Sequence, residues 1–115
     1  MIKASFSITP DHQTVAFKLT GHADAGDYGH DIVCAAVSVL SISTVNGLTK
    51  VVHSTPEIDK NDTEGGYLQV TQIATGHDAQ ILMNTFLNAM EDIQEQYPDF
   101  VSIKIHEVHA GGEQV

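Results

Sequence analysis

A chain of 115 residues that is 42% hydrophobic can bury one core but not two, so we predict a single domain over residues 1–115 and exclude a disordered chain. Fifteen acidic residues stand against five lysines and no arginine, and the formal charge of −10 repels nucleic-acid phosphates and anionic lipid. We therefore expect neither nucleic acid nor a membrane as a direct partner. An acidic surface serves solubility or attracts a basic partner, and charge alone leaves both open.

The single cysteine, Cys34, excludes an intramolecular disulfide and is typical of a protein kept in a reducing cytoplasm. We expect that no apolar run reaches the roughly 18 residues that a membrane-spanning helix needs. Residues 1–8 alternate between apolar and polar rather than forming a charged and then apolar leader, so we expect no secretory signal. Together these observations predict a cytoplasmic protein.

The first half of the chain predicts a β-hairpin, a loop and a helix. Apolar residues alternate with polar ones over residues 2–8 and 15–19, as in strands with one buried face, and a turn containing proline and aspartate joins them. A glycine-containing polar loop, residues 21–30, precedes a helix from Asp31 to about Leu48 whose apolar residues recur at helical spacing. We expect the Asp31 carboxylate to cap the start of this helix.

The second half predicts, in order, a short edge strand around 57–60, a hairpin turn at 62–66, a strand over 67–73, a helix over 78–97, a strand over 101–105, and a frayed tail from 106 that is disordered over about 107–115. Asp78 is expected to cap the second helix, and Pro98 stops it. This order of elements predicts an α+β fold, a mixed and largely antiparallel sheet with two helices packed on one face.

Cys34 follows Asp31 by three residues, so with Asp31 as N-cap it would be the third residue of the helix. Unpaired backbone N–H groups and the positive end of the helix dipole lie in that first turn, and both stabilise a thiolate. The same N–H groups could hold an oxyanion formed beside the sulfur. This placement therefore favours a nucleophilic thiol.

A nucleophilic cysteine also needs a base, and His22 and His30 are the nearby histidines. His22 ends a strand, and rigid elements hold catalytic geometry better than loops, so we favour His22 over His30. The loop between them, residues 23–30, contains two glycines and no large aliphatic side chain. Such a loop is either a plain connection or a lid that substrate orders.

Two other interpretations of the cysteine compete with catalysis. His22, Asp24, Asp27, His30 and Cys34 could supply metal ligands, but their spacing matches none of the compact zinc patterns, so we predict no metal. Cys34 could instead be a small buried hydrophobe, as lone helical cysteines often are. The residues by themselves do not decide between an inert and a catalytic cysteine.

The stretch GHADAGDYGHDIVCAAVS, residues 21–38, resembles the signature of the ribosomal-processing cysteine protease (Prp) family. In that family a GHA segment and a G-x-D-x-x-C-A segment flank a glycine-containing loop. The resemblance extends over most of the chain, except for the HEVHAGGEQV tail, and it implies a cysteine protease without metal or cofactor.

By this resemblance His22 is the general base, Cys34 the nucleophile and Asp31 a supporting residue. It also implies a set of substrate contacts in the loop and on the helix: Asp24, Gly26, Asp27, Tyr28, Gly29 and Ser38. The family's substrate is the N-terminal extension of a large-subunit ribosomal protein, number twenty-seven of that subunit, cut after a motif with paired aromatic residues. Family members are homodimers, so the resemblance implies a homodimer here.

The acidic surface suits such a substrate, because ribosomal proteins are rich in lysine and arginine. It also leaves one alternative from another functional class. The chain could be a non-catalytic acidic module that binds or chaperones a basic ribosomal protein, in which case Cys34 would be dispensable.

Overall fold

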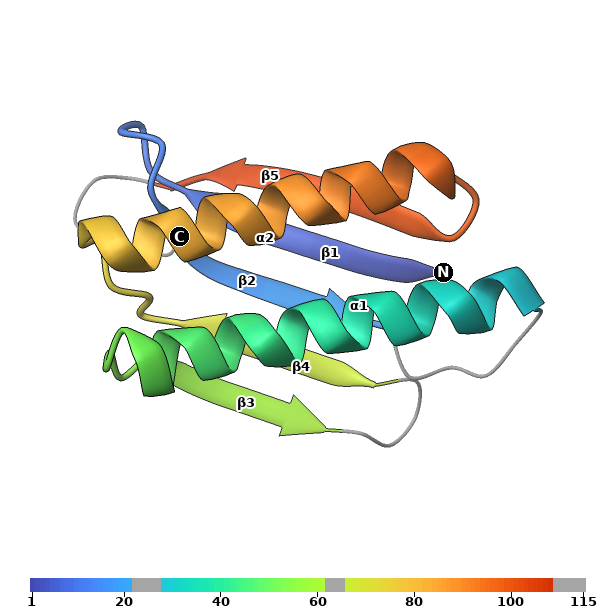
Figure 1. Ribbon diagram of the computed structural model, residues 1–115. Coiled ribbons are helices and arrows are strands. Elements are labelled where there is room, and N and C mark those ends of the chain that lie inside the picture. The colour runs from blue at the N-terminus through green and yellow to red at the C-terminus, as the bar shows by residue number, and fades with distance from the viewer. Residues whose placement is uncertain (22–27, 62–65, 109–115) are drawn as a thin grey trace.

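The computed structural model describes residues 1–21, 28–61 and 66–108, and for residues 28–31 it describes the backbone only. Within this part of the chain, five strands form one sheet that carries two helices on one face (Figure 1). The strand order is β3-β4-β2-β1-β5, with β1 Ile2–Ile8, β2 Thr14–Thr20, β3 Glu57–Asn61, β4 Tyr67–Thr71 and β5 Val101–Glu107. All neighbours pair antiparallel except β1 and β5, which pair in parallel. The predicted α+β fold and its mixed, largely antiparallel sheet are confirmed.

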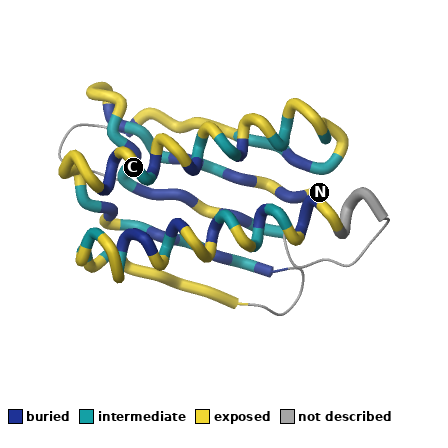
Figure 2. The backbone as a smooth tube through the Cα atoms, viewed as in Figure 1, coloured by how far each residue is buried: buried dark blue, intermediate teal, exposed yellow. Residues whose placement is uncertain are grey.

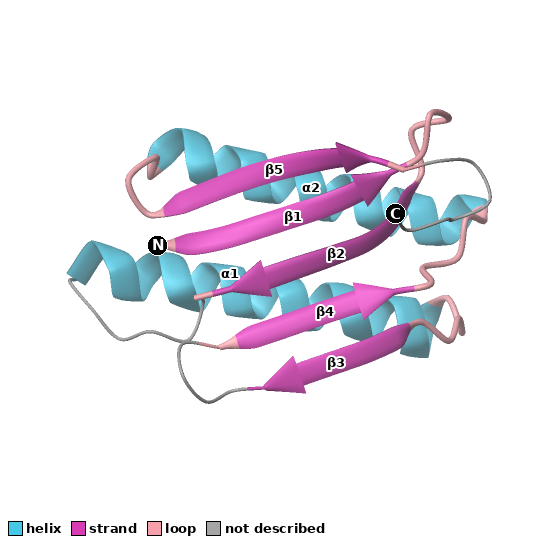
Figure 3. Cartoon of the chain, turned by 180° about the vertical axis from the view of Figure 1, so that it is seen from behind, coloured by secondary structure: helices cyan, strands magenta, loops and turns pink. Residues whose placement is uncertain are grey.

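The two helices, α1 (Tyr28–Asn46) and α2 (His77–Gln96), lie side by side on the same face of the sheet. Seen from behind, the strands face the viewer and neither of these helices covers them (Figure 3). α1 runs directly into a short π-helical turn, η1 (Gly47–Val51), so the helical segment ends later than predicted. A β-carbon at Gly47 would lie 2.9 Å from Leu82 Cδ1, which shows how closely the two helical segments approach there.

The core lies between the sheet and the helices, and the buried stretches of β1, β2 and β4 face it (Figure 2). Because side chains alternate along the strands, the apolar ones point toward the helices. α2 covers the core on the side away from the sheet. At its centre three phenylalanine rings meet, Phe6, Phe17 and Phe86, and the ring centroids of Phe17 and Phe86 are 4.9 Å apart. Burying a ring of this size contributes about 2–3 kcal/mol.

Two of the predicted ends in the second half are wrong. α2 begins at His77 with Gly76 as its N-cap, so Asp78 lies inside the first turn, where its charge opposes the helix dipole without capping. β4 ends at Thr71 rather than at residue 73, because Gln72 adopts a positive φ of 56° and turns the chain. The predicted edge strand is confirmed as β3, and its antiparallel pairing with β4 is that of a hairpin, although residues 62–65 of the predicted turn lie outside the described residues.

The last strand is longer than predicted. β5 runs to Glu107, and the amide of Val108 donates a hydrogen bond to the carbonyl of Ile8 at 2.9 Å. Val108 is also buried, so the chain is held against the sheet past the predicted start of the frayed tail. The prediction for residues 109–115 lies outside the described residues.

The segment Ile32–Val51, made of most of α1 and η1, is long and apolar enough to cross a membrane by length and composition. This corrects the expectation that no apolar stretch reaches that length, because serine and threonine interrupt the run without adding charge. The core helix of a globular domain passes the same test. Val33, Val37 and Leu48 of this segment are fully buried in the core, which places one side of α1 against the rest of the domain.

Candidate functional site

Cys34 lies on the side of α1 that faces the sheet. It is the seventh residue of the helix, belongs to the core cluster and is 8% exposed. The predicted position, third in the helix behind an Asp31 cap, is wrong, because α1 begins at Tyr28 and includes Asp31. Glycine and aspartate in residues 28–31 suggested a helix start, yet the backbone is already helical there.

This correction changes the chemistry available to the thiol. The unpaired N–H groups of α1 belong to its first turn, at residues 28–31, and the helix dipole acts mainly within that turn. Cys34 lies in the second turn, so its sulfur gains less from the helix start than the sequence indicated. A nucleophilic thiol at this position would depend more on a separate base.

The end of β2 fixes the point from which the loop with the predicted base departs. Gly21 follows β2 directly with a φ of +80°, and its amide donates to the carbonyl of Gly66 at 3.3 Å. A β-carbon at Gly21 would lie 2.6 Å from the carbonyl oxygen of Met1. Only glycine fits this combination of positive φ and close backbone contact. No separate role was predicted for Gly21, although its place directly before His22 was a usable signal.

The predicted site residues fall into three groups. His22, Asp24, Gly26 and Asp27 lie outside the described residues. Tyr28, Gly29 and Asp31 form the first turn of α1, for which the backbone alone is described. Ser38, one turn after Cys34, is half-buried, and its carbonyl accepts a hydrogen bond from the Ser41 hydroxyl at 3.1 Å. The structure thus places Cys34 and Ser38 on one helix.

A metal site is not formed by the residues that the structure describes, since no three of their histidine, cysteine, aspartate and glutamate side chains gather closely enough to hold an ion. The loop residues of the metal alternative, His22, Asp24 and Asp27, are outside that part of the chain. The described part of the site therefore presents one thiol on α1, and β2 is the strand that leads into the histidine segment.

Comparison with known proteins gives concordant results over nearly the whole chain. The family model described as cysteine protease Prp matches residues 1–102. The ribosomal processing cysteine protease Prp of Staphylococcus aureus is 31% identical over 104 residues, which are 90% of this chain and 97% of that protein. Both matches include the segment from Gly21 to Ser38.

Solved structures agree with the fold. A crystal structure of a Streptococcus mutans protein has a TM-score of 0.85 at 35% identity, covering 94% of this chain and 96% of that one. The ribosomal processing protease Prp of S. aureus, in complex with a covalently linked product peptide, has a TM-score of 0.81 at 28% identity, covering 91% and 99%. The sheet and both helices described above are therefore shared with these relatives.

Proposed function

This chain belongs to the Prp family of cysteine proteases, and we propose that it removes the N-terminal extension of large-subunit ribosomal protein number twenty-seven with a Cys34–His22 dyad. The observation that carries the proposal is the place of Cys34. The only thiol of the chain lies on α1 at the position of the family signature, within the core cluster on the helix face that is turned to the sheet, and β2 leads directly into the segment with His22. A covalently linked product peptide in the S. aureus relative supports a covalent route for the family.

In the proposed mechanism, His22 takes the proton of the Cys34 thiol and the sulfur attacks the scissile carbonyl carbon. The tetrahedral intermediate collapses as the C–N bond breaks, and protonated His22 gives its proton to the leaving amine. A water molecule, deprotonated by His22, then attacks the thioester, and the Cys34 sulfur leaves as the new carboxyl terminus is released. Asp31, three residues before Cys34 on α1, is proposed to support the dyad.

The substrate contacts are proposed to come from the loop and the start of α1. Asp24, Gly26, Asp27, Tyr28 and Gly29 precede the thiol in the chain, and two of them are acidic, which suits a basic ribosomal protein. Ser38 is proposed to line the site from the next turn of α1. We place the protein in the cytoplasm, where a ribosomal precursor is made and where a single reduced thiol is stable.

The charge of the helical layer supports a basic substrate. No lysine occurs between residues 61 and 103, while α2 and the turn after it carry five acids, Asp78, Glu91, Asp92, Glu95 and Asp99. The field of this layer speeds the encounter with a lysine- and arginine-rich protein, and the effect weakens as salt is added. The peptide therefore arrives on the side of the molecule that carries the thiol.

We propose that the homodimer of the family forms here through the outer face of α1. Residues 32–49 contain no charged side chain, and Ile32, Val39 and Ile42 on this helix are 43%, 65% and 50% exposed. Two copies that each carry a charge of −10 repel one another through their acidic surfaces, and an uncharged surface lowers that repulsion where they meet. Apolar side chains at helical spacing on such a surface are typical of a helix that packs against a partner.

The dyad is tested with Cys34→Ala and Cys34→Ser incubated with a peptide that carries the ribosomal extension, followed by mass spectrometry. Both variants are expected to fold like the parent, judged by circular dichroism, and to leave the peptide intact. Ser38→Ala is the comparison variant on the same helix, and it should retain measurable cleavage. Normal cutting by Cys34→Ala would refute the Cys34 mechanism, and a parent protein that leaves the peptide intact while binding the ribosomal protein would favour the non-catalytic acidic module.

The dimer is tested by sedimentation velocity with Val39→Glu. This change puts a charge in the middle of the uncharged face of α1, so the dimer should dissociate into monomers. Ile81→Glu is the matched control, because Ile81 is an exposed isoleucine of α2, 52% accessible, and its replacement should leave the dimer intact. A dimer that persists in Val39→Glu rules out this interface.

A further inference from the structure

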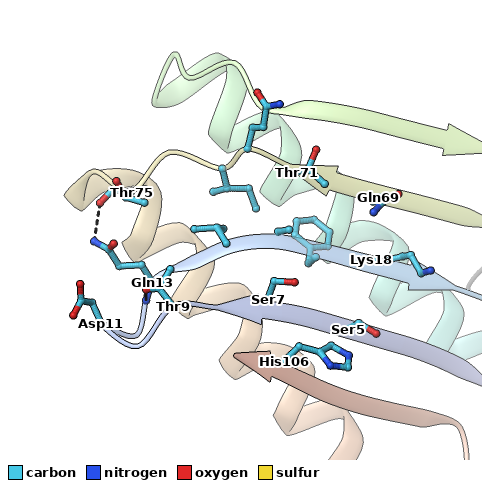
Figure 4. A pocket seen from close by; sticks show the side chains of 15 residues that line it. Ser5, Ser7, Thr9, Asp11, Gln13, Lys18, Gln69, Thr71, Thr75 and His106 are labelled. Atoms are coloured by element: carbon cyan, nitrogen blue, oxygen red, sulfur yellow. Dashed lines mark hydrogen bonds between the residues drawn. The ribbon is translucent and has the colours of Figure 1, made fainter. Parts of the chain in front are cut away.

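The face of the sheet without helices holds a groove of about 990 Å³ (Figure 4). Hydroxyl and amide side chains from β1, β4 and the adjoining turns line much of it, and Lys18 of β2 and His106 of β5 also line it. Cys34 and Ser38 do not line this groove, and the helix that carries them lies on the other side of the sheet. It is therefore a surface that the proposed proteolysis does not use.

The strand register gathers lysines around one serine of this face. Ser5 on β1 pairs with Lys18 on β2 and with Lys104 on β5, so the two lysines flank its hydroxyl on either side. Neighbouring strands are about 4.8 Å apart, which puts the α-carbons of Lys18 and Lys104 about 10 Å from each other. Lys3 lies two residues before Ser5 and shares its face, and His106 pairs with Ser7 in the next row.

This grouping is unexpected in an acidic protein. Three of the five lysines of the chain lie on one face, and within the described residues none of the three forms an ion pair with a carboxylate. The acids nearest to this face are at its margins. Asp11 lines the groove from the turn between β1 and β2, and Asp59 and Glu57 lie on the edge strand, opposite Gln69 and Thr71 of β4. The middle of the face is thus left with uncompensated positive charge.

We infer that the face that carries Lys3, Lys18 and Lys104 around Ser5, here called the lysine face, binds a small anion with two or more phosphate groups. Two flexible lysine side chains whose α-carbons are about 10 Å apart can each reach a phosphate placed over Ser5, and the hydroxyls of Ser5 and Ser7 can donate to phosphate oxygens. Like charges that share a face destabilise a sheet slightly, and a bound polyanion removes that repulsion. The neutral hydroxyl and amide side chains around the lysines offer further hydrogen bonds without competing charge.

The same face does not suit a long nucleic acid. Each added phosphate of a polymer is repelled by a protein with a net charge of −10, so the unfavourable electrostatic energy grows with polymer length. A small anion carries few phosphates, so this unfavourable energy stays small. Binding of single strands also needs aromatic rings on which bases stack. The aromatic residue that the described part of this face offers is Tyr67, whose hydroxyl bonds Gln69 Oε1 at 2.6 Å and whose ring lies 5.8 Å from Lys18 Nζ. The Tyr67 ring therefore already contacts the Lys18 ammonium and is less available for stacking on a base.

The test is isothermal titration calorimetry with sodium tripolyphosphate at low ionic strength. Lys18→Gln/Lys104→Gln is expected to weaken binding at least tenfold, and added sodium chloride should weaken binding to the parent protein. Lys50→Gln is the matched control, because Lys50 is an exposed lysine of η1, and it should bind like the parent. All three replaced side chains are exposed, so the variants should keep the parent's melting temperature.

Separate titrations with orthophosphate, ATP and a ten-nucleotide RNA identify the kind of anion. Binding of tripolyphosphate and ATP that depends on Lys18 and Lys104 supports the inference. No saturable heat, equal binding by the double variant, or lysine-dependent binding of the RNA alone would each overturn it. Because calorimetry needs no cleavage, its outcome is independent of whether the proposed proteolysis is correct.

Discussion

Replacing Gly21 by alanine should impair both stability and catalysis, because this residue fixes the end of β2 directly before His22. The backbone at Gly21 has a φ of +80°, which a residue with a side chain rarely adopts. The added β-carbon would lie 2.6 Å from the carbonyl oxygen of Met1, well inside van der Waals contact. This oxygen belongs to the backbone, so relief requires movement of either the start of β1 or the end of β2.

Two contributions set the size of the effect. Holding an alanine at positive φ costs about 1–2 kcal/mol, and displacing a strand end by several tenths of an ångström adds roughly 1–2 kcal/mol. The expected loss in the free energy of unfolding is therefore about 2–4 kcal/mol. For a domain of this size, each kcal/mol lowers the melting temperature by about 4 °C. The displaced strand end also moves His22, so kcat/KM for the extension peptide should fall by more than tenfold.

Both quantities can be measured on the same protein preparations. Urea unfolding gives the free energy, and cleavage of the extension peptide at a temperature where every variant is folded gives kcat/KM. Gly76→Ala is the matched control, because nothing lies within 4 Å of a β-carbon built there and its φ is −66°. Its stability should stay within about 1 kcal/mol of the parent, and its cleavage should not change.

An alanine at Gly21 that matches the parent in both stability and cleavage would refute this reasoning about the strand end. A variant that loses stability but keeps its kcat/KM would refute only the link to His22. In that case β2 would be strained at its end without carrying the base into position.

Two further predictions concern stability. Gln80→Ala should lower the free energy of unfolding by about 2–4 kcal/mol. The Gln80 side chain accepts a hydrogen bond from the amide of Thr14 and donates to the carbonyls of Thr14 and Ala74, at 2.8–2.9 Å. Urea unfolding checks this prediction, and an unchanged midpoint would contradict it. His53→Gly should raise the melting temperature by about 2–4 °C, because His53 has a φ of 63° just after η1, where glycine is unstrained; a lower melting temperature in a calorimetric scan would count against it.

The strands and the second helix were predictable because their signals are local. Alternating apolar and polar residues predicted β1 and β2, and Pro98 predicted the end of α2, as the structure confirms. The start of α1 was not predictable in the same way, since Gly29 and Asp31 favour a helix boundary by propensity, and the backbone is helical through both.

Features that join distant parts of the chain were beyond local patterns. The parallel pairing of β1 with β5 brings together residues about 100 positions apart, and no periodicity encodes it. The grouping of Lys3, Lys18 and Lys104 on one face follows from that pairing and from the register of β1 with β2. For the site, the signature motif identified the thiol and its family, while the position of Cys34 in the second helical turn came from the structure. The roles of His22 and Asp31 stay predictions.

The pairing of β1 with β5 has a consequence for biosynthesis. A nascent chain emerges with its N-terminus first, so β1, β2 and α1 leave the ribosome long before residues 101–107. Until then one edge of β1 has no partner strand, and the amide of Ile2 lacks the carbonyl of Phe100, which it bonds at 2.8 Å in the finished fold. The core around Cys34 also lacks Val101 at that stage. We expect a chain that ends before residue 101 to expose this edge, aggregate and fail to cut peptide. The protein would therefore become able to cut peptide only after the last strand has formed.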